Sequence, residues 1–269
     1  MRHPGTNEGG AVARVMAAWR LEADGAAFAT RWSTLVPVRR DGAALMLKLA
    51  HSLEEARGGR LMQAWGGAGA AFVSARRGPA LLMERAPGGT LAGLDDDAAT
   101  RAIVAVAGRL RAATPPLPRL VPLRRWFRAL LPAREGVLGA CAAVARGLLE
   151  DPRDEGVLHG DLHHGNVLDF GAAGWKAIDP KGLWGECGFE FAALLRNPDA
   201  GRALAAGRME RQAALVAALT GIPPERVLAW VAAAAGLSAA WTLSDGGDAA
   251  ADLALARRAL QARRRGLRR

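Results

Sequence analysis

Apolar and polar positions alternate over short distances in the first third of the chain. Several short apolar runs are separated there by polar turns, and Asp41-Gly42 between two of them is a strong signal for a β-hairpin. These runs cover residues 26–30, 35–39, 44–49 and 80–86. Residues 9–19 and 51–65 instead place apolar side chains every three or four positions, which is typical of a helix. The pattern predicts a small antiparallel sheet with two accompanying helices.

The helical period dominates after Pro87-Gly88-Gly89, a turn signal that ends the last of these runs. Helices are predicted to begin at Asp95–Asp97 and to cover 123–131, 137–149, 189–195, 202–219, 224–243 and 249–264. A sheet followed by helices is an α+β arrangement. We therefore expect an N-terminal lobe at residues 1–86, a mainly helical C-terminal lobe at residues 87–269, and a site between the lobes.

The stretch 157–181 interrupts the helices and carries the candidate chemistry. Its three apolar runs predict short strands, with a polar loop between the first two. Asp161 and Asn166 lie in that loop, and Asp179 lies where the last strand ends. Three oxygen-bearing side chains are expected to converge there. Such a group suits Mg²⁺ binding and proton transfer better than a surface loop.

Phosphoryl transfer explains these residue types, because it needs a carboxylate near the attacking hydroxyl and oxygen ligands for Mg²⁺ beside the phosphates. Asp161 is the predicted catalytic proton acceptor, and Asn166 and Asp179 are the predicted metal ligands. The kinase catalytic loop has the pattern H-R-D-L-x-x-x-N, and residues 159–166 have H-G-D-L-H-H-G-N with the same Asp-to-Asn interval. Gly160 replaces the arginine that pairs with a phosphorylated activation loop, which favours a small acceptor over a protein substrate.

The motif HGDLHHGNVL, followed by IDPKGLWGE and FEFAALLRNP, resembles the aminoglycoside/hydroxyurea antibiotic resistance kinases, whose best-known members are streptomycin 6-phosphotransferases. The resemblance covers nearly the whole chain. It implies a bilobal protein-kinase-like fold, ATP and Mg²⁺ as cofactors, and a small hydroxyl-bearing acceptor. Streptomycin, at its streptidine 6-hydroxyl, is the implied acceptor, with hydroxyurea or another small metabolite as the alternative. Its pocket is expected among the C-terminal helices, where Asp245 or Glu186 could meet a guanidinium group.

Lys48 lies in an apolar run between Leu47 and Leu49, so it points to the opposite strand face from both neighbours. Kinases carry the lysine that contacts the ATP phosphates on the third strand, which makes Lys48 the candidate; a lysine that extends to solvent is the alternative. A glutamate of the next helix orients this lysine in kinases, and Glu54 and Glu55 are both available. Similarity to an E-E-R-x-G pattern of the family favours Glu55.

Other nucleotide contacts are implied by the same resemblance. Ser33 and Thr34 belong to a turn similar to the T-x-S-S turn of the family, so their hydroxyl and backbone groups are expected to face the phosphates, although both could simply be turn residues. Met83, Glu84 and Ala86 lie where the family has its interlobe hinge. Backbone groups between Met83 and Ala86 are therefore expected to bond the adenine edge.

Composition limits the possible partners. The net charge of +10 invites a nucleic-acid hypothesis, but arginine is spread along the chain and its one dense run, at residues 263–269, has no interleaved aromatic residues. Nucleic-acid binding is therefore not expected. The same charge counts mildly against a strongly cationic acceptor, unless acidic residues line the acceptor pocket.

No apolar run is expected to span a membrane, since the nearest, Val227–Leu243, contains Gly236 and Ser238 and suits a buried helix. The first ten residues lack the apolar core of a signal peptide, and two cysteines make no disulfide framework. A cytoplasmic, monomeric enzyme without membrane contacts is the expectation.

Two further alternatives concern the catalytic loop. His159, His163 and His164 could suggest zinc, but two adjacent histidines in one loop give poor tetrahedral geometry. A pseudokinase that binds nucleotide without turnover is the other alternative, and the presence of every predicted phosphate, base and metal residue argues against it.

Overall fold

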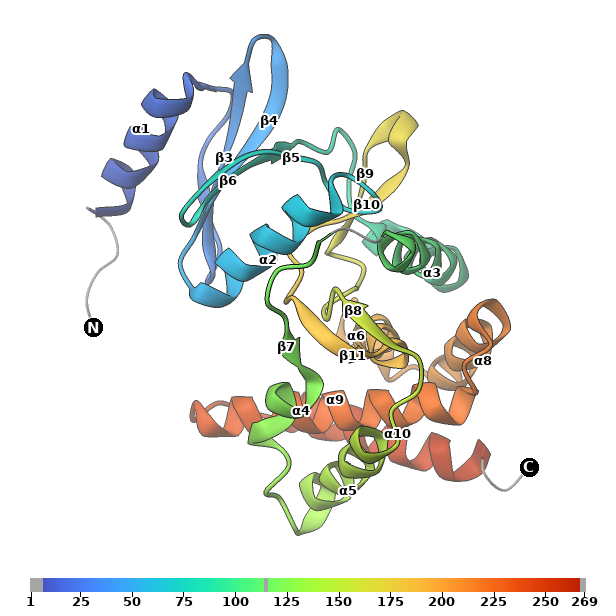
Figure 1. Ribbon diagram of the computed structural model, residues 1–269. Helices are drawn as coiled ribbons and strands as arrows, with labels where there is room; N and C mark the ends of the chain where they lie inside the picture. Colours follow the sequence, from blue (N-terminus) through green and yellow to red (C-terminus); the bar gives the residue numbers. More distant parts are fainter. Residues whose placement is uncertain (1–6, 114–115, 267–269) are drawn as a thin grey trace.

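The computed structural model describes residues 7–113 and 116–266, which form a sheet-containing part followed by a mainly helical part (Figure 1). One antiparallel sheet dominates the first part, with strand order β1-β3-β4-β6-β5 and β2 paired to β3. Its strands are β1 (Glu22–Ala23), β2 (Phe28–Ala29), β3 (Ser33–Arg40), β4 (Ala43–Ala50), β5 (Val73–Arg77) and β6 (Ala80–Glu84). The predicted α+β class is confirmed.

Helices α1 (Asn7–Trp19) and α2 (Leu53–Trp65) belong to different apolar clusters of this sheet. The α1 side chains pack with Leu47 and Leu82, whereas Met62 of α2 packs with Leu81 and Met83. Because neighbouring strand residues point to opposite faces, the two helices cover opposite faces of the sheet. Lys48 follows Leu47, so it lies on the α2 face.

The hairpin between β3 and β4 confirms the prediction from Asp41-Gly42. Both residues take positive φ angles, 52° and 79°, as a type I′ turn requires. The resulting register pairs Leu35 with Lys48. The run at residues 26–30 was wrong in extent, since only Phe28–Ala29 forms a strand. Strand β5 was not predicted, because its sequence Val-Ser-Ala-Arg-Arg lacks the apolar run of a buried strand.

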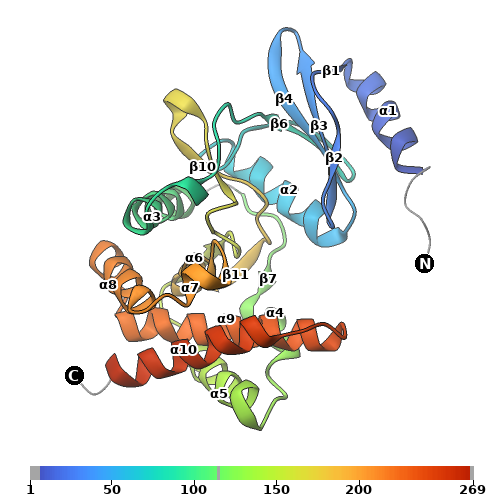
Figure 2. The ribbon, with the colours of Figure 1, turned by 180° about the vertical axis from the view of Figure 1, so that it is seen from behind.

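The second part contains eight α-helices among the described residues, and Figure 2 shows α10 lying along α9. They are α3 (Asp96–Ala112), α4 (Leu123–Trp126), α5 (Gly136–Glu150), α6 (Glu190–Arg196), α7 (Ala200–Ala203), α8 (Arg208–Thr220), α9 (Pro224–Ser244) and α10 (Ala250–Gly266). The helix predicted over 202–219 is divided into α7 and α8. The helix predicted over 123–131 is shorter, because α4 passes into a 3₁₀ turn at Phe127–Ala129.

Short strands hold the candidate catalytic residues in place. β9 (Val167–Asp169) and β10 (Trp175–Ala177) form the predicted hairpin, and β8 (Glu155–Leu158) precedes the catalytic loop. β11 (Leu183–Glu186), which was not predicted, pairs antiparallel with β8 and parallel with β7 (Val121–Pro122). The chain on both sides of the segment 159–182 is therefore fixed in one small sheet.

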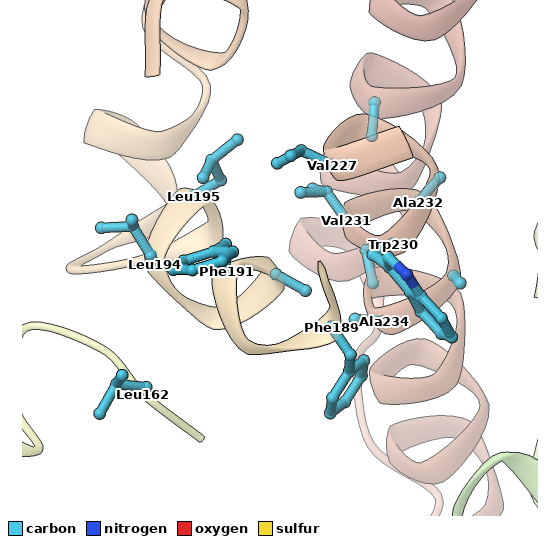
Figure 3. Close-up of a cluster of buried hydrophobic side chains, with 14 of the residues drawn as sticks. Leu162, Phe189, Phe191, Leu194, Leu195, Val227, Trp230, Val231, Ala232 and Ala234 are labelled. Atoms are coloured by element: carbon cyan, nitrogen blue, oxygen red, sulfur yellow. The ribbon is translucent and has the colours of Figure 1, made fainter. Parts of the chain in front are cut away.

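Helix α9 forms the centre of the helical core. Figure 3 shows Phe189 and residues of α6 facing Val227, Trp230 and Val231 of α9, and the rings of Phe189 and Trp230 lie 5.5 Å apart. By length and composition α9 could cross a membrane, which corrects the expectation that no run qualifies. However, 67% of its apolar window is buried inside the protein, between α5, α6, α8 and α10. The prediction of a buried helix here is confirmed.

The boundary between residues 86 and 87 remains our proposal. Strand β6 ends at Glu84, and a 3₁₀ turn at Leu91–Gly93 already pairs with the catalytic segment through Thr90 and Leu168. The connection between the two parts is therefore short, and the candidate site lies on both sides of it.

Candidate active site

Lys48, Glu55 and Asp179 form one buried ion-pair cluster. The Nζ atom of Lys48 lies 2.5 Å from Glu55 Oε2 and 2.7 Å from Asp179 Oδ1. Only 4% of the Lys48 surface is exposed, so the alternative of a lysine that extends to solvent is wrong. A buried lysine needs such partners, because its charge has lost water. The cluster joins strand β4, helix α2 and the end of the catalytic segment.

Glu55, rather than Glu54, is the glutamate that reaches Lys48. Ser52 caps α2 by accepting a hydrogen bond from the Glu55 N–H, which fixes the first turn of the helix. Glu54 instead lies 3.3 Å from the Nζ of Lys181, and 40% of its side chain is exposed. The other Glu55 oxygen, Oε1, lies 3.5 Å from the same Lys181 Nζ. Glu55 thus stands between two lysines.

Asp161 and Asn166 are brought together as predicted. The Asn166 Nδ2 donates to the Asp161 carbonyl at 2.9 Å and lies 3.5 Å from its Oδ2. Lys181 Nζ is 3.9 Å from the same Oδ2, and His163 Nε2 is 3.8 Å from Oδ1. The Asp161 carboxylate is partly exposed, so it lies near one cation, Lys181, and is also open to a ligand.

Two buried side chains, Glu190 and His159, form hydrogen bonds with the backbone of the loop that carries Asp161. Glu190 accepts hydrogen bonds from the His159 and Gly160 N–H groups at 3.1 and 2.6 Å, and burial raises its pKa to about 7. His159 donates from Nε2 to the Ile178 carbonyl at 2.7 Å, and Nδ1 accepts from the Asp161 N–H. Burial lowers the His159 pKa to about 4, so the ring is neutral at pH 7. Both ring nitrogens are occupied, which leaves none for zinc.

Gly160 has a structural reason for lacking a side chain. Its φ is +84°, and a β-carbon there would lie 2.7 Å from the Leu183 side chain. Neither conformation nor space admits an arginine at this position. The Lys181 N–H donates to the His159 carbonyl at 2.7 Å, which closes the loop over the glycine.

Asn166 and Asp179 together offer oxygen donors for a divalent cation. Asn166 uses its Nδ2 within the loop and Asp179 uses Oδ1 for Lys48, which leaves Asn166 Oδ1 and Asp179 Oδ2 for a metal. Asp179 also takes a positive φ of 60°, an uncommon conformation for a residue with a side chain. Within the described ranges no group of three His, Cys, Asp or Glu side chains could hold a metal alone. The donor set fits Mg²⁺, which commonly takes one or two protein ligands plus phosphates and water.

Ser33 and Thr34 point to opposite faces of the sheet, because side chains alternate along strand β3, which begins at Ser33. Ser33 is buried on the Lys48 face, and its Oγ lies 3.2 Å from Thr30 Oγ1. Thr34 pairs with Leu49 and points to the other face, where its Oγ1 lies 2.9 Å from His51 Nε2. The structure brings Ser33 toward Lys48 but not Thr34.

Met83, Glu84 and Ala86 lie at the end of β6, beside the catalytic strands. Met83 is buried in the α2-side cluster. The Glu84 N–H already donates to the Phe72 carbonyl at 2.9 Å, and its carboxylate lies 2.7 Å from Lys176 Nζ of β10. A nucleotide contact of Glu84 therefore has to come from its carbonyl group.

A cavity of about 180 Å³ opens beside Asp161, with its far wall on α6 and α9. Arg196, Leu237 and Trp241 contribute to that wall, so the predicted location among the C-terminal helices fits the geometry. Glu186 does not belong to it. Glu186 is 2% exposed and its carboxylate accepts hydrogen bonds from Arg226 and Trp230, which corrects the expectation that it could meet an acceptor.

The family description aminoglycoside/hydroxyurea antibiotic resistance kinase matches residues 18–246. The chain belongs to this family. The predictions of the family and of a kinase are thus confirmed.

Three relatives of this kinase carry names that bear on the acceptor. A streptomycin 3''-kinase of Klebsiella pneumoniae is 48% identical over 89% of this chain and 97% of its own length. A hydroxyurea phosphotransferase of Kitasatospora aureofaciens is 33% identical over 88% and 74%, respectively. A streptomycin 6-kinase of Streptomyces glaucescens is 32% identical over 86% and 81%.

Solved structures confirm the protein-kinase-like fold. A thermostable mutant of aminoglycoside phosphotransferase APH(4)-Ia, in a ternary complex with ADP and hygromycin B, matches with a TM-score of 0.65 and 14% identity over 95% of this chain and 97% of that chain. Choline kinase LicA from Streptococcus pneumoniae matches with a TM-score of 0.68 and 12% identity over 97% and 100%. At these identities the likeness concerns the fold alone.

The structure of this kinase places two further basic residues, Lys181 and Arg196, near Asp161. Lys181 follows Asp179-Pro180 in the IDPKGLWGE motif, and its Nζ lies among Glu54, Glu55 and Asp161, where it partly neutralises these carboxylates. Burial alone would lower the Lys181 pKa, but these three carboxylates together raise it. Arg196 was missed, although it ends the FEFAALLRNP motif; it lines the cavity and lies 3.5 Å from Asp252.

Proposed function

We propose that this kinase transfers the γ-phosphoryl group of ATP to a hydroxyl group of a streptomycin-type aminoglycoside. The position of Asp161 carries the proposal: its carboxylate lines the cavity on α6 and α9, and its loop leads through Asn166 to the Lys48–Asp179 pair. Phosphoryl donor and acceptor can thus meet at one loop. Streptomycin is favoured because the relative with 48% identity is named for it.

In this mechanism the acceptor hydroxyl lies in the cavity beside Asp161, which accepts its proton as the oxygen attacks the γ-phosphorus. The bond from that phosphorus to the bridging oxygen breaks, and ADP leaves with the electron pair. Lys48, held by Glu55 and Asp179, contacts the α- and β-phosphates. Lys181, 3.9 Å from Asp161, holds positive charge close to the reacting groups.

Asn166 and Asp179 are the residues that would hold Mg²⁺, which when bound neutralises charge on the phosphates. The Glu84 carbonyl and the Ala86 N–H are the backbone groups we assign to the adenine edge, together with the packing of Met83. Ser33 is retained as a phosphate contact from the Lys48 face. Thr34 points to the opposite face of β3, so its side chain could contact the phosphates only if the strand rotated.

The position of phosphorylation is part of the proposal. The relative with 48% sequence identity is named a 3''-kinase, which favours the 3''-hydroxyl of streptomycin. The resemblance seen in the sequence motifs instead implied the 6-hydroxyl, and a relative with 32% identity is named a 6-kinase. Hydroxyurea is the second candidate, from a relative with 33% identity. We also keep a monomeric, cytoplasmic enzyme without nucleic-acid or membrane partners as a prediction.

The test is an acceptor screen with purified protein, ATP and Mg²⁺. Streptomycin, hygromycin B and hydroxyurea are incubated separately, and products are identified by a mass gain of one phosphoryl group and by ³¹P–¹H NMR for the position. Phosphorylated streptomycin is the expected product. ATP binding without any phosphorylated acceptor would instead support the pseudokinase alternative.

A further inference from the structure

A wide cleft of about 940 Å³ lies outside the catalytic cavity, between α2 and the segment of β7 and α4. Cleft and cavity share four lining residues, Trp126, Lys181, Ser238 and Trp241. The cleft is therefore the outer continuation of the cavity at Asp161. An acceptor too large for the cavity can extend into this cleft while its hydroxyl group lies beside Asp161.

Arginine dominates the walls of this cleft. It comes from three segments of the chain: Arg31 before β3, Arg57 and Arg60 on α2, and Arg119, Arg125 and Arg128 around β7 and α4. The two acidic lining residues already have cationic neighbours. Glu54 lies 3.3 Å from Lys181 Nζ, and Asp245 lies 3.6 Å from Arg31.

Most of the arginines that line the cleft have no acidic partner among the described residues to neutralise their charge. Within the part of the chain that the structure describes, Arg60, Arg119, Arg125 and Arg128 form no ion pair with a carboxylate. Burial lowers the Arg57 pKa, and the nearby charges of Arg125 and Arg60 lower it further, while Glu54 raises it. An anion placed between these guanidinium groups would relieve their mutual repulsion.

We propose that this cleft contains an anion subsite, formed by Arg57 and Arg60 on α2 and Arg125 on α4, through which the enzyme takes a second class of acceptor: hydroxyl compounds that already carry a phosphate group. The planar guanidinium fork matches phosphate oxygens in pairs, which makes phosphate the anion that suits several arginines best. The cleft has room for such a group beyond the catalytic cavity. A polycationic acceptor meets no comparable partner there.

The reaction at this subsite is the same phosphoryl transfer, so the inference rests on the proposed function for its chemistry. The acceptor hydroxyl forms the new bond to the γ-phosphorus, its proton passes to Asp161, and ADP leaves. The existing phosphate of the acceptor stays intact and is held by the arginines. The product is a bisphosphorylated compound.

Binding can be tested without turnover. Inorganic tripolyphosphate is titrated calorimetrically into protein whose nucleotide site is filled with AMP-PNP, at constant ionic strength. We expect the double variant Arg60→Gln/Arg125→Gln to bind it at least about tenfold more weakly, because each variant removes a charge-assisted hydrogen bond. Arg101→Gln, an exposed position on α3, is the matched control and should bind as the wild type. Equal binding by wild type and double variant would overturn the subsite.

Turnover then tests the acceptor class. A panel of sugars and polyols is compared with their monophosphates, with streptomycin alongside, and products are identified by mass. We expect phosphoryl transfer to at least one monophosphate, with a KM that rises about tenfold or more in the double variant while the KM values for ATP and streptomycin do not rise. An enzyme that phosphorylates streptomycin but no monophosphate would reject the second acceptor class. Turnover of monophosphates alone would leave the subsite intact and reject streptomycin.

Discussion

Gly58 of α2 lies so close to Pro180 that a β-carbon at position 58 would stand 2.1 Å from the Pro180 carbonyl oxygen. No side chain therefore separates the helix from the segment that follows Asp179. Glu55 lies three residues earlier on α2, and this close approach lets it stand between Lys48 and Lys181. The contact brings α2 close to the segment that follows Asp179, and Asp179 in turn pairs with Lys48.

Gly58→Ala should therefore damage the site more than an ordinary helix substitution. The new methyl group meets backbone, which cannot rotate away, so α2 must shift by about an ångström or more and the Lys48–Glu55–Asp179 cluster must loosen. We expect kcat/KM for ATP to fall by about 10²-fold, as small displacements of positioned groups commonly cost. Steady-state kinetics with varied ATP measure this.

Gly147→Ala on α5 is the matched control. A β-carbon at position 147 meets nothing within 4 Å, so alanine should leave activity unchanged and stabilise the helix by about 0.5–1 kcal/mol. A Gly58→Ala enzyme with the kinetics of the control would show that α2 does not depend on this contact.

Glu55→Gln and Glu54→Gln should separate the two adjacent glutamates. Glu55 is buried between two lysines, and loss of one charge there leaves Lys48 and Lys181 short of a partner, for which buried pairs typically cost about 3–5 kcal/mol. We expect KM for ATP to rise at least about tenfold and the Tm to fall. Glu54→Gln should change KM less than about threefold, because its pair with Lys181 is partly exposed. A larger effect of Glu54→Gln would reverse the assignment.

Asp161→Asn and Asp179→Asn should differ in which kinetic constant changes. Asp161→Asn removes the proton acceptor and should lower kcat about 10²- to 10⁴-fold with nearly unchanged ATP binding. Asp179→Asn should instead weaken Mg-ATP binding, because Asp179 both holds Lys48 and offers an oxygen to the metal. Initial rates and calorimetric titration of AMP-PNP distinguish the two. Full activity of both variants would remove the site assignment.

Local sequence pattern was sufficient to predict that Asp161 and Asn166 share one loop and that Asp179 follows the next hairpin. The spacing of Asp161, Asn166 and Asp179 depends on short strands and a tight loop, all of which follow from neighbours in sequence. Local pattern could not choose between Glu54 and Glu55, since both occupy the first turn of α2. The placement of α2 against the segment after Asp179, where Gly58 closely approaches Pro180, puts Glu55 rather than Glu54 beside Lys48.

The remaining misses come from strand alternation and from partners distant along the chain. Ser33 and Thr34 were treated as one turn, but β3 begins at Ser33 and strand alternation sends them to opposite faces. Glu186 was considered for the acceptor because it is acidic, but Arg226 of α9 already binds it within the protein. The basic cleft is likewise assembled from segments nearly 100 residues apart.

Glu190 should give the stability of the protein a distinctive pH dependence. Burial raises its pKa from the ordinary 4.5 to about 7 in the folded state, so the folded chain retains a proton that the unfolded chain releases between these values. Its contribution is fully present below about pH 4.5 and is lost as the pH rises through 7. At about 1.4 kcal/mol per pKa unit the loss amounts to about 3 kcal/mol.

Comparison with Glu190→Gln isolates this effect, because the glutamine amide stays neutral while it occupies the same site beside the His159 and Gly160 N–H groups. Urea unfolding is measured at pH 5 and pH 8 for both proteins, with the exposed Glu155→Gln as the matched control. The wild type should lose about 2.5 kcal/mol relative to Glu190→Gln over that interval, which covers most of the titration. Burial lowers the pKa of His159 to about 4, so the contribution of His159 to stability increases as the pH rises, opposite to that of Glu190. The stability of the wild type alone would therefore conceal the effect of Glu190. A stability difference that stays constant from pH 5 to pH 8 would mean that Glu190 is already ionised in the folded protein at pH 5, held by its two N–H donors despite its burial.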